Sequence, residues 1–318
     1  MDSLERAREP YGLRDGKARV NLGLLGFIRV RPRTLWFARW RVMMKENENY
    51  GVGSLLTEGA VTYLKKYYIG NVVESILYIG LLIGNLLLFF KTNNIYIFLI
   101  LFFAVILLNV RYKTATAAKT MALLSKKCDP LTFRDVMWGF LIKCKKKTAS
   151  LRYYMNVAHA NYHLCDAKAM GVALSMVDAG ACNHMDTICY MHRQLCYCQL
   201  TGDEKMFARW DAKFVEYGTG KMSVKEQKYY LSVAKEIEVL RALIDNDTQQ
   251  ILELCEAKKA RTRSLAEKVH MEYEMARVLM ETGAYDEAKS HVYYVVEYGN
   301  TSGYTRICNE KYLKKVAQ

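Results

Sequence analysis

The stretch that decides the fold reads NVVESILYIGLLIGNLLLFF at residues 71–90, KTNN at 91–94 and IYIFLILFFAVILLNV at 95–110. A helix needs roughly 20 apolar residues to cross the hydrocarbon core of a bilayer. The first segment reaches this length, and the second approaches it with Asn94 and Arg111 as polar ends that can extend to the interface. So short a link forces the two helices to run antiparallel. The sequence therefore predicts a transmembrane hairpin at residues 69–112, with both flanking chains on one side.

The distribution of basic residues close to the hairpin predicts which side that is. The flanks carry several basic residues and the link carries only one, and such an excess marks the cytoplasmic side. We therefore expect an inner (cytoplasmic) membrane protein with two spans and cytoplasmic N- and C-termini. The first ten residues show no signal-peptide pattern, and nine cysteines suit a reducing compartment. The flanking residues are Lys65, Lys66, Arg111, Lys113, Lys119, Lys126 and Lys127, against Lys91 in the link.

Composition favours an all-α chain, because only three prolines occur in 318 residues. The net charge of +14 is spread over both flanks of the hairpin. In a membrane protein this charge predicts attraction to an anionic lipid surface. We do not expect nucleic acid as a partner, since no nucleic-acid motif accompanies the charge.

The N-terminal region, residues 1–68, is basic and contains one amphipathic segment. At residues 34–44, Trp36 and Trp40 share a helical face while Arg39 and Arg41 lie elsewhere. Tryptophan beside arginine favours the boundary between water and lipid, which predicts an interfacial helix. An ordinary amphipathic helix packed on the soluble domain explains the pattern equally well.

Small residues occur one helical turn apart in the first apolar stretch. Gly80 and Gly84 would allow close approach of another helix, and Asn85 would hydrogen-bond across such a pair. One interpretation is a homodimer through Gly80 and Gly84, or a surface for another membrane protein. The alternative, which we favour, is packing against the hairpin's own second helix near Ala104.

Residues 113–318 are expected to form a cytoplasmic domain of paired helices. Asp129 and Pro130 predict a helix start, followed by a helix at residues 131–144. From residue 150, short turns recur at a spacing of about forty residues, which indicates a helical solenoid. The expected pairs are 150–165 with 166–179, 186–200 with 202–217, 223–244 with 247–259 and 264–281 with 284–299, followed by a helix at 304–316.

The last pair resembles the tetratricopeptide repeat. Its first helix holds a small residue, the turn a glycine and then an aromatic residue, and its second helix an alanine. Two positions depart from the family pattern, since Glu272 stands where tryptophan is usual and Asn300 replaces the closing proline. The earlier pairs keep only the helix–turn–helix spacing, so the predicted fold is a two-helix transmembrane hairpin followed by a TPR-like α-solenoid of about four pairs. The matching residues are Ala276, Leu279, Gly283, Tyr285 and Ala288.

This resemblance implies a concave surface that binds a protein or peptide. Aromatic, histidine and amide side chains on the first helix of each pair would line it and hold an extended peptide or a helix. The alternative is that several of them are packed between neighbouring pairs. The implied groove residues are Tyr153, Asn156 and His163, then Cys189, His192, Cys196 and Gln199, and finally His270, Tyr273 and Arg277.

Cysteine and histidine share one face in the segment 186–200. Cys189, His192 and Cys196 are spaced i, i+3 and i+7, so thiol and imidazole ligands for zinc lie on the same side. The spacing matches no familiar zinc pattern, and buried cysteine is also common between helices. We therefore expect no metal and no cofactor. The chain also contains no phosphate-binding loop, nucleophile elbow or kinase signature, so no catalytic residue is predicted.

The sequence thus predicts a membrane-anchored adaptor that binds a protein or peptide partner through its cytoplasmic repeats. It would act by concentrating that partner beside the membrane. Two other interpretations are a membrane-tethered metal or thiol sensor that uses the 186–200 face, and an accessory subunit of a membrane transport or secretion complex.

Overall fold

The computed structural model describes residues 56–144 and 147–317, which contain helices and turns but no strand. Residues 56–318 form one compact unit. The all-α prediction is therefore confirmed for this part of the chain. The tryptophan-containing segment at residues 34–44, and with it the expected interfacial helix, lies outside the described residues.

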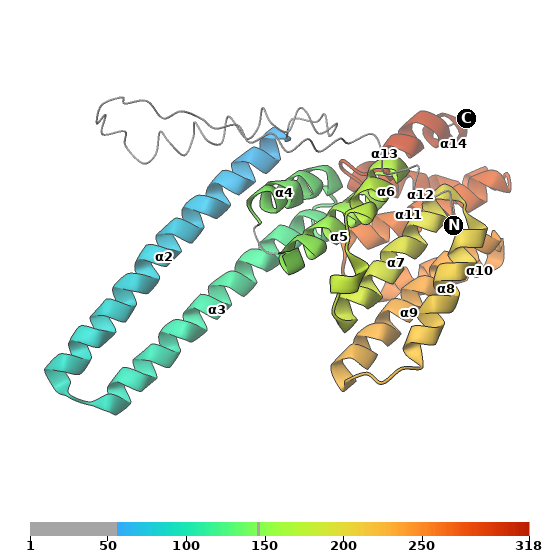
Figure 1. Cartoon of the computed structure of the whole chain (residues 1–318). Coiled ribbons are helices and arrows are strands. Elements are labelled where there is room, and N and C mark those ends of the chain that lie inside the picture. The colour runs from blue at the N-terminus through green and yellow to red at the C-terminus, as the bar shows by residue number, and fades with distance from the viewer. Residues whose placement is uncertain (1–55, 145–146, 318) are drawn as a thin grey trace, which may run out of the picture. The chain divides into compact units, whose positions relative to one another are not determined.

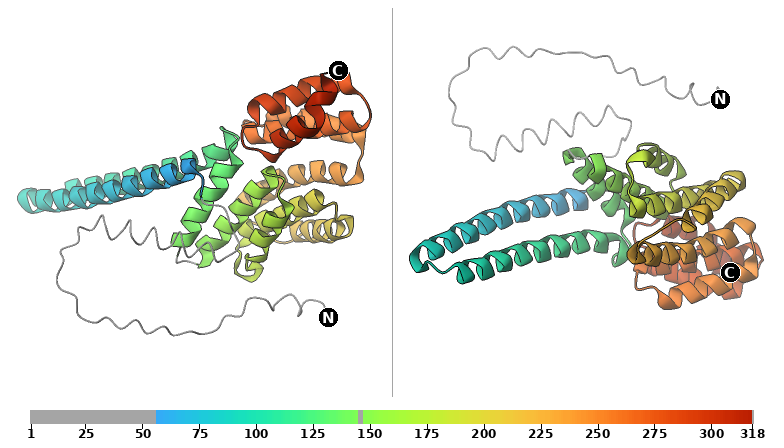
Figure 2. Two further views of the ribbon diagram at one scale, coloured as in Figure 1. Left: turned by 90° about the horizontal axis from the view of Figure 1, so that it is seen from above. Right: turned by 60° about the horizontal axis from the view of Figure 1, so that its bottom comes forward.

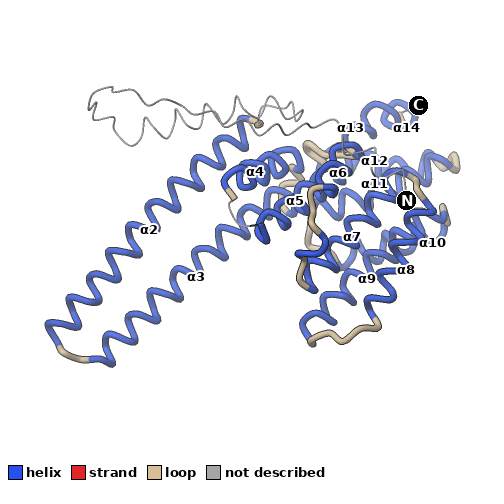
Figure 3. Tube along the Cα trace, in the orientation of Figure 1, coloured by secondary structure: helices blue, strands red, loops and turns tan. Residues whose placement is uncertain are grey.

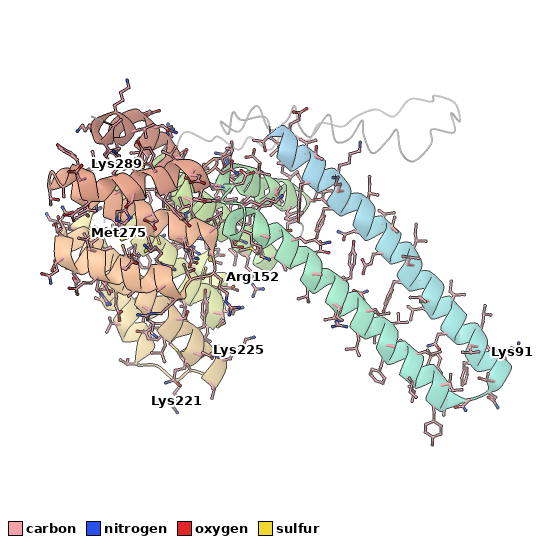
Figure 4. The ribbon with its side chains drawn as sticks, turned by 180° about the vertical axis from the view of Figure 1, so that it is seen from behind. Lys91, Arg152, Lys221, Lys225, Met275 and Lys289 are labelled. Atoms are coloured by element: carbon pink, nitrogen blue, oxygen red, sulfur yellow. The ribbon has the colours of Figure 1, made fainter. Side chains whose placement is uncertain are left out.

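Two long helices form the predicted hairpin (Figure 1). Helix α2 spans Glu58–Thr92 and α3 spans Ile95–Ser125. Asn93 ends α2 in the left-handed region at φ 47°, and the side chain of Asn94 accepts hydrogen bonds from two amides in the first turn of α3. Asparagine suits both roles because it tolerates positive φ and bonds locally to the backbone. Figure 4 shows Lys91 next to this turn, at the end of the hairpin away from the other helices.

Both helices are long and apolar enough to cross a membrane. Most large apolar side chains between residues 69 and 110 are exposed, and Ile76, Leu87 and Phe90 are each more than 60% exposed. Soluble proteins rarely expose an apolar surface of this extent. The exposed exterior therefore favours a lipid environment over the core of a soluble protein.

The two helices meet along a narrow seam. Asn85, only 5% exposed, donates from Nδ2 to the carbonyl oxygen of Phe98 at 3.1 Å, and Tyr63 hydrogen-bonds Thr120 at 2.7 Å. Both bridges fit one antiparallel register, since 22 residues separate Tyr63 from Asn85 and also Phe98 from Thr120. The less exposed positions of α2 recur every three or four residues, the spacing of a coiled-coil seam. They are Asn71, Glu74, Tyr78, Leu82, Asn85 and Phe89.

Helix α4 (Pro130–Lys143) packs the base of the hairpin onto the following helices. Leu64 of α2 occupies the space beside Gly139, where an added Cβ would lie 2.3 Å from Leu64 Cδ1. The backbone N–H of Thr57 donates to the carboxylate of Asp135 at 2.8 Å. The hairpin is therefore joined to the rest of the unit by packed side chains and buried hydrogen bonds.

Four helix pairs follow α4 in the described part of the chain, and Figure 3 shows their short connecting loops. The predicted pairs are confirmed to within a few residues at most ends, because Asp166, Asp203 and Asp247 cap second helices as turn residues should. The pairs are α5 (Lys147–His163) with α6 (Ala167–Ser175), α7 (His184–Thr201) with α8 (Glu204–Gly218), α9 (Val224–Asp245) with α10 (Thr248–Arg261), and α11 (Leu265–Glu281) with α12 (Tyr285–Tyr298).

Short helical segments complete the unit. They are the 3-10 helix η2 (Ala179–Ala181), α13 (Gly303–Ile307), the π-helical segment η3 (Cys308–Tyr312) and α14 (Leu313–Val316). The last three follow one another without a break, as the predicted helix at 304–316 requires.

One contact joins two pairs that are not neighbours along the chain. In a linear array each pair contacts only its neighbours, whereas here Tyr162 of α5 lies against His270 of α11, with ring centroids 5.3 Å apart. A second bridge joins Thr301 to Asp129 at 2.7 Å. Figure 2 shows the last helices, in orange and red, beside the green and yellow ones. The first and fourth pairs are therefore in contact through Tyr162 and His270.

Candidate functional site

Helix α11 is the central helix of the body and carries charged groups in its buried interior. Glu274 is 3% exposed and accepts from Arg277 Nε at 2.8 Å, while His270 Nε2 lies 3.3 Å from its other oxygen. Burial alone would raise the pKa of Glu274, but His270 and Arg277 hold it below its usual value. Glu274 is therefore an ionised, fully partnered carboxylate.

A cluster of stacked rings, which we call the aromatic junction, joins α5 to α11 and α13. Tyr162 donates to Gln199 Oε1 of α7 at 3.0 Å and lies 3.3 Å from His270 Nε2. Tyr304 stacks on His270 with centroids 5.1 Å apart. Side chains from four helices thus converge on one buried point. The aromatic junction comprises Tyr162, His163, His270, Tyr273 and Tyr304.

A second cluster, the Arg193 site, lies between α5, α7 and α10. The rings of His159 and His163 are 4.8 Å apart at their centroids, and their Nδ1 atoms are buried without a hydrogen-bond partner. Arg193 hydrogen-bonds the thiol of Cys196. The site consists of His159, His163, His192, Arg193 and Lys258.

The Arg193 site contains two basic side chains, Arg193 and Lys258, and Lys258 is paired with Glu236. Burial and the nearby Arg193 guanidinium lower the pKa of His159, His163 and His192 well below the usual histidine value, so these rings are neutral at pH 7. Burial lowers the pKa of Arg193, but neighbouring thiol and phenol groups raise it to a net value above normal, so the guanidinium stays charged. The site therefore holds a permanent cation among neutral imidazoles.

Four residues that the sequence assigns to the groove are buried instead. His163, His270 and Tyr273 are 2%, 5% and 9% exposed and belong to the aromatic junction, and Cys196 is 2% exposed. A buried side chain cannot line an accessible surface, so this part of the prediction is wrong. Their burial agrees with the alternative that several of the expected groove residues pack inside the body.

The other groove candidates are divided between different surroundings. Tyr153 packs against Phe140 of α4, with ring centroids 5.7 Å apart, and so faces the base of the hairpin. Gln199 and Arg277 are half-buried and bonded within the body. Asn156 and His192 are also half-buried, so each keeps part of its surface accessible.

The candidate zinc ligands of the 186–200 segment, Cys189, His192 and Cys196, lie in different surroundings. The described residues contain no group of three or more His, Cys, Asp or Glu side chains that could hold a metal. Cys189 packs against the apolar cluster around Leu151 and Met155, while Cys196 is 2% exposed beside Arg193. Burial raises the pKa of Cys196 to about 11, so it is a protonated thiol at neutral pH and a poor metal ligand or redox sensor.

The hairpin glycines face outward. A Cβ added at Gly80 or Gly84 would meet nothing within 4 Å, so neither residue packs against α3 near Ala104 as we expected. The seam register explains this correction, since Tyr78 and Leu82 occupy the inward positions of the same turns. By contrast, Asn85 makes the cross-helix hydrogen bond expected of it, to α3 of its own hairpin.

A surface cleft of about 500 Å³ lies where α4, α6 and α13 meet. Arg134 and Arg306 line it together with Asp166 and Thr301. Arg134 is paired with Asp135 at 3.0 Å, so part of the basic charge is already neutralised. No local sequence pattern marks this cleft, because its walls come from residues 131–167 and 301–306.

No family model, curated protein or solved structure matches this chain. Its function is therefore inferred from the chain's own geometry. Arg193 was not among the predicted site residues. It follows Cys189 by four residues and precedes Cys196 by three, so it lies on the same helical face as these cysteines.

Proposed function

We propose that this chain is a membrane-anchored adaptor, with the hairpin spanning the inner membrane and the helical body recruiting a protein partner on the cytoplasmic side. The observation that carries the proposal is that the same two helices form the apolar hairpin and contact the body. Helices α2 and α3 have an apolar, exposed exterior over residues 69–110, and their other ends pack directly on α4. Such an anchor would hold the body close to the bilayer surface. A partner bound there is concentrated at the membrane.

The topology in this proposal rests on charge. Basic residues gather at the hairpin base, whereas the link carries Lys91 alone. The basic base would also contact anionic lipid headgroups. A cysteine introduced at Thr92 should react with a membrane-impermeant maleimide in intact cells, and one at exposed Lys221 should react only after lysis. The unmodified protein corrects for its own nine cysteines, and the reverse pattern would overturn the topology.

With part of the expected groove buried, the partner surface in this proposal centres on Asn156 and His192. A photo-crosslinking amino acid placed at either position in the full-length protein should capture one specific protein in cells. The same amino acid at Val172 or Val215, which are 44% and 50% exposed on other helices, serves as the control. Equal capture at all four positions, or none at Asn156 and His192, would contradict the adaptor surface.

A homodimer through Gly80 and Gly84 is a further part of the proposal, favoured by the outward, open position of both glycines. Small outward residues allow close packing of helices in lipid. Gly84→Ile should abolish disulfide crosslinking between copies that carry a cysteine at Ile83, while leaving the hairpin folded. Unchanged crosslinking would exclude this dimer interface.

A further inference from the structure

The Arg193 site contains a cation without a matching anion. Arg193 belongs to no ion pair among the described residues. The nearby carboxylates are already engaged, since Glu236 pairs with Lys258 and Glu274 pairs with Arg277.

The other neighbours of Arg193 do not supply the missing charge. Burial raises the pKa of Cys196 to about 11 and that of Tyr229 to about 12, so both are neutral at pH 7. Neither group therefore balances the charge of Arg193. Its guanidinium presents N–H donors in a planar fork that matches an oxyanion.

Two histidines of the Arg193 site carry a ring nitrogen that has no hydrogen-bond partner. The Nδ1 atoms of His159 and His163 are buried and have no partner, and only 2% of the His163 surface is exposed. Most buried polar atoms in proteins have a partner, so each exception needs an explanation. A neutral imidazole in the right tautomer donates a hydrogen bond from this atom.

The site is not sealed. His159, His192 and Arg193 each keep part of their surface exposed, which gives a small solute or a protruding side chain access to the guanidinium. We propose that the Arg193 site binds an oxyanion group, a carboxylate or a phosphate, held between α5, α7 and α10 by Arg193 and the surrounding histidines. This inference does not depend on the adaptor function.

Histidine NMR on the purified full-length protein in detergent tests the proposal directly. The protein is labelled at the histidine Cε1 carbons and titrated at pH 7 with inorganic phosphate, replacing sodium chloride at constant ionic strength. All six histidines lie in the helical body, so His159, His163 and His192 can be assigned from single variants. Their signals should shift saturably, while those of His184 and His291 stay in place.

Matched variants separate a bound anion from a general salt effect. R193M should weaken binding by at least ~10-fold, because it removes the charge and the N–H donors that the oxyanion would contact. R241Q, which changes an arginine paired with Asp211 outside the site, should titrate like the wild-type chain. Should R193M fail to fold, R193K keeps the charge without the planar fork and should bind several-fold more weakly.

A second titration identifies the source of the oxyanion. A short glutamate peptide is used in place of phosphate, with the same variants. Saturable shifts with phosphate indicate a free anion, and shifts with the peptide alone indicate a carboxylate from a protein partner. No saturable shift with either probe, or equal shifts in the wild-type chain and R193M, would overturn the proposal.

Discussion

The hairpin and the helical body both bury polar groups, but they surround them differently. In the hairpin an apolar exterior encloses a seam where Asn85 makes one hydrogen bond to Phe98. In the body a charged exterior encloses an interior that contains Glu274, Arg193 and neutral histidines. Over residues 69–110 the exterior of the hairpin is therefore mostly apolar, whereas in the body polar groups occur on the surface and again at the centre.

This difference suits the surroundings that we propose for each region. Lipid tails offer no hydrogen bonds, so a membrane hairpin is stabilised when a polar side chain such as Asn85 bonds to the partner helix. The body has water outside, and its buried charges persist only where other side chains balance them. The centre of the body should therefore be far more sensitive to substitution than the seam of the hairpin.

The largest expected effect is at Glu274. Glu274→Gln removes the charge that balances Arg277 and contacts His270, which should lower the free energy of unfolding by about 3–5 kcal/mol. Urea denaturation followed by the fluorescence of Trp138 and Trp210 measures this. Glu281→Gln, at the exposed end of the same network, should cost less than about 1 kcal/mol. Equal effects would show that burial does not distinguish the two carboxylates.

The second largest effect is expected at acidic pH, which should lower the stability of the helical body. The folded-state pKa values of His159, His163 and His192 lie well below 6.5, so the unfolded chain binds more protons once the pH falls below that value. Stability is therefore complete above about pH 6.5 and decreases as the pH falls, by about 1 kcal/mol per pH unit for each histidine. Denaturation curves from pH 7.5 to 5.5 test this, and a His163→Asn variant should flatten the slope. A slope of zero would contradict the buried, neutral state of these rings.

The contact between α13 and the end of α5 should also depend on Gly303. A Cβ at this position would lie 2.2 Å from the carbonyl oxygen of Leu164, a backbone atom that cannot rotate away. Gly303→Ala should therefore push α13 from α5 and cost about 1–3 kcal/mol. Gly180→Ala is the control, because its Cβ would meet only ordinary contact at 3.5 Å from Asp178. A thermal melt compares the two variants. Equal midpoints would mean that α13 can shift to accommodate the added methyl group without loss of stability.

The smallest effect is expected in the hairpin. Asn85→Leu loses the bond to Phe98 but also removes the buried Oδ1, which has no partner. The net change should be within about 1 kcal/mol, as for other hydrogen bonds between membrane helices. Detergent-exchange unfolding measures it, with Leu86→Ala on the outward face as the reference. A loss as large as that of Glu274→Gln would remove the contrast between the two regions.

The sequence predicted the elements well because their signals are local. The hairpin, its link and the four helix pairs follow from apolar runs, caps and turn residues within a few positions of each end. The same signals identified Asn85 as a residue that bonds across a helix pair. They did not indicate which way Gly80 and Gly84 face, since helical phase depends on the register with α3.

By itself, the sequence determined an all-helical chain with two apolar helices long enough to cross a membrane, because hydrophobic length and capping act over short distances. Only the tertiary structure decided what the inner faces of α5, α7 and α11 do. Tyr162 and His270 are 108 positions apart, and their contact places both side chains in the interior of the body. No pattern within a single helix encodes such a contact, because it depends on how helices distant in the sequence pack together.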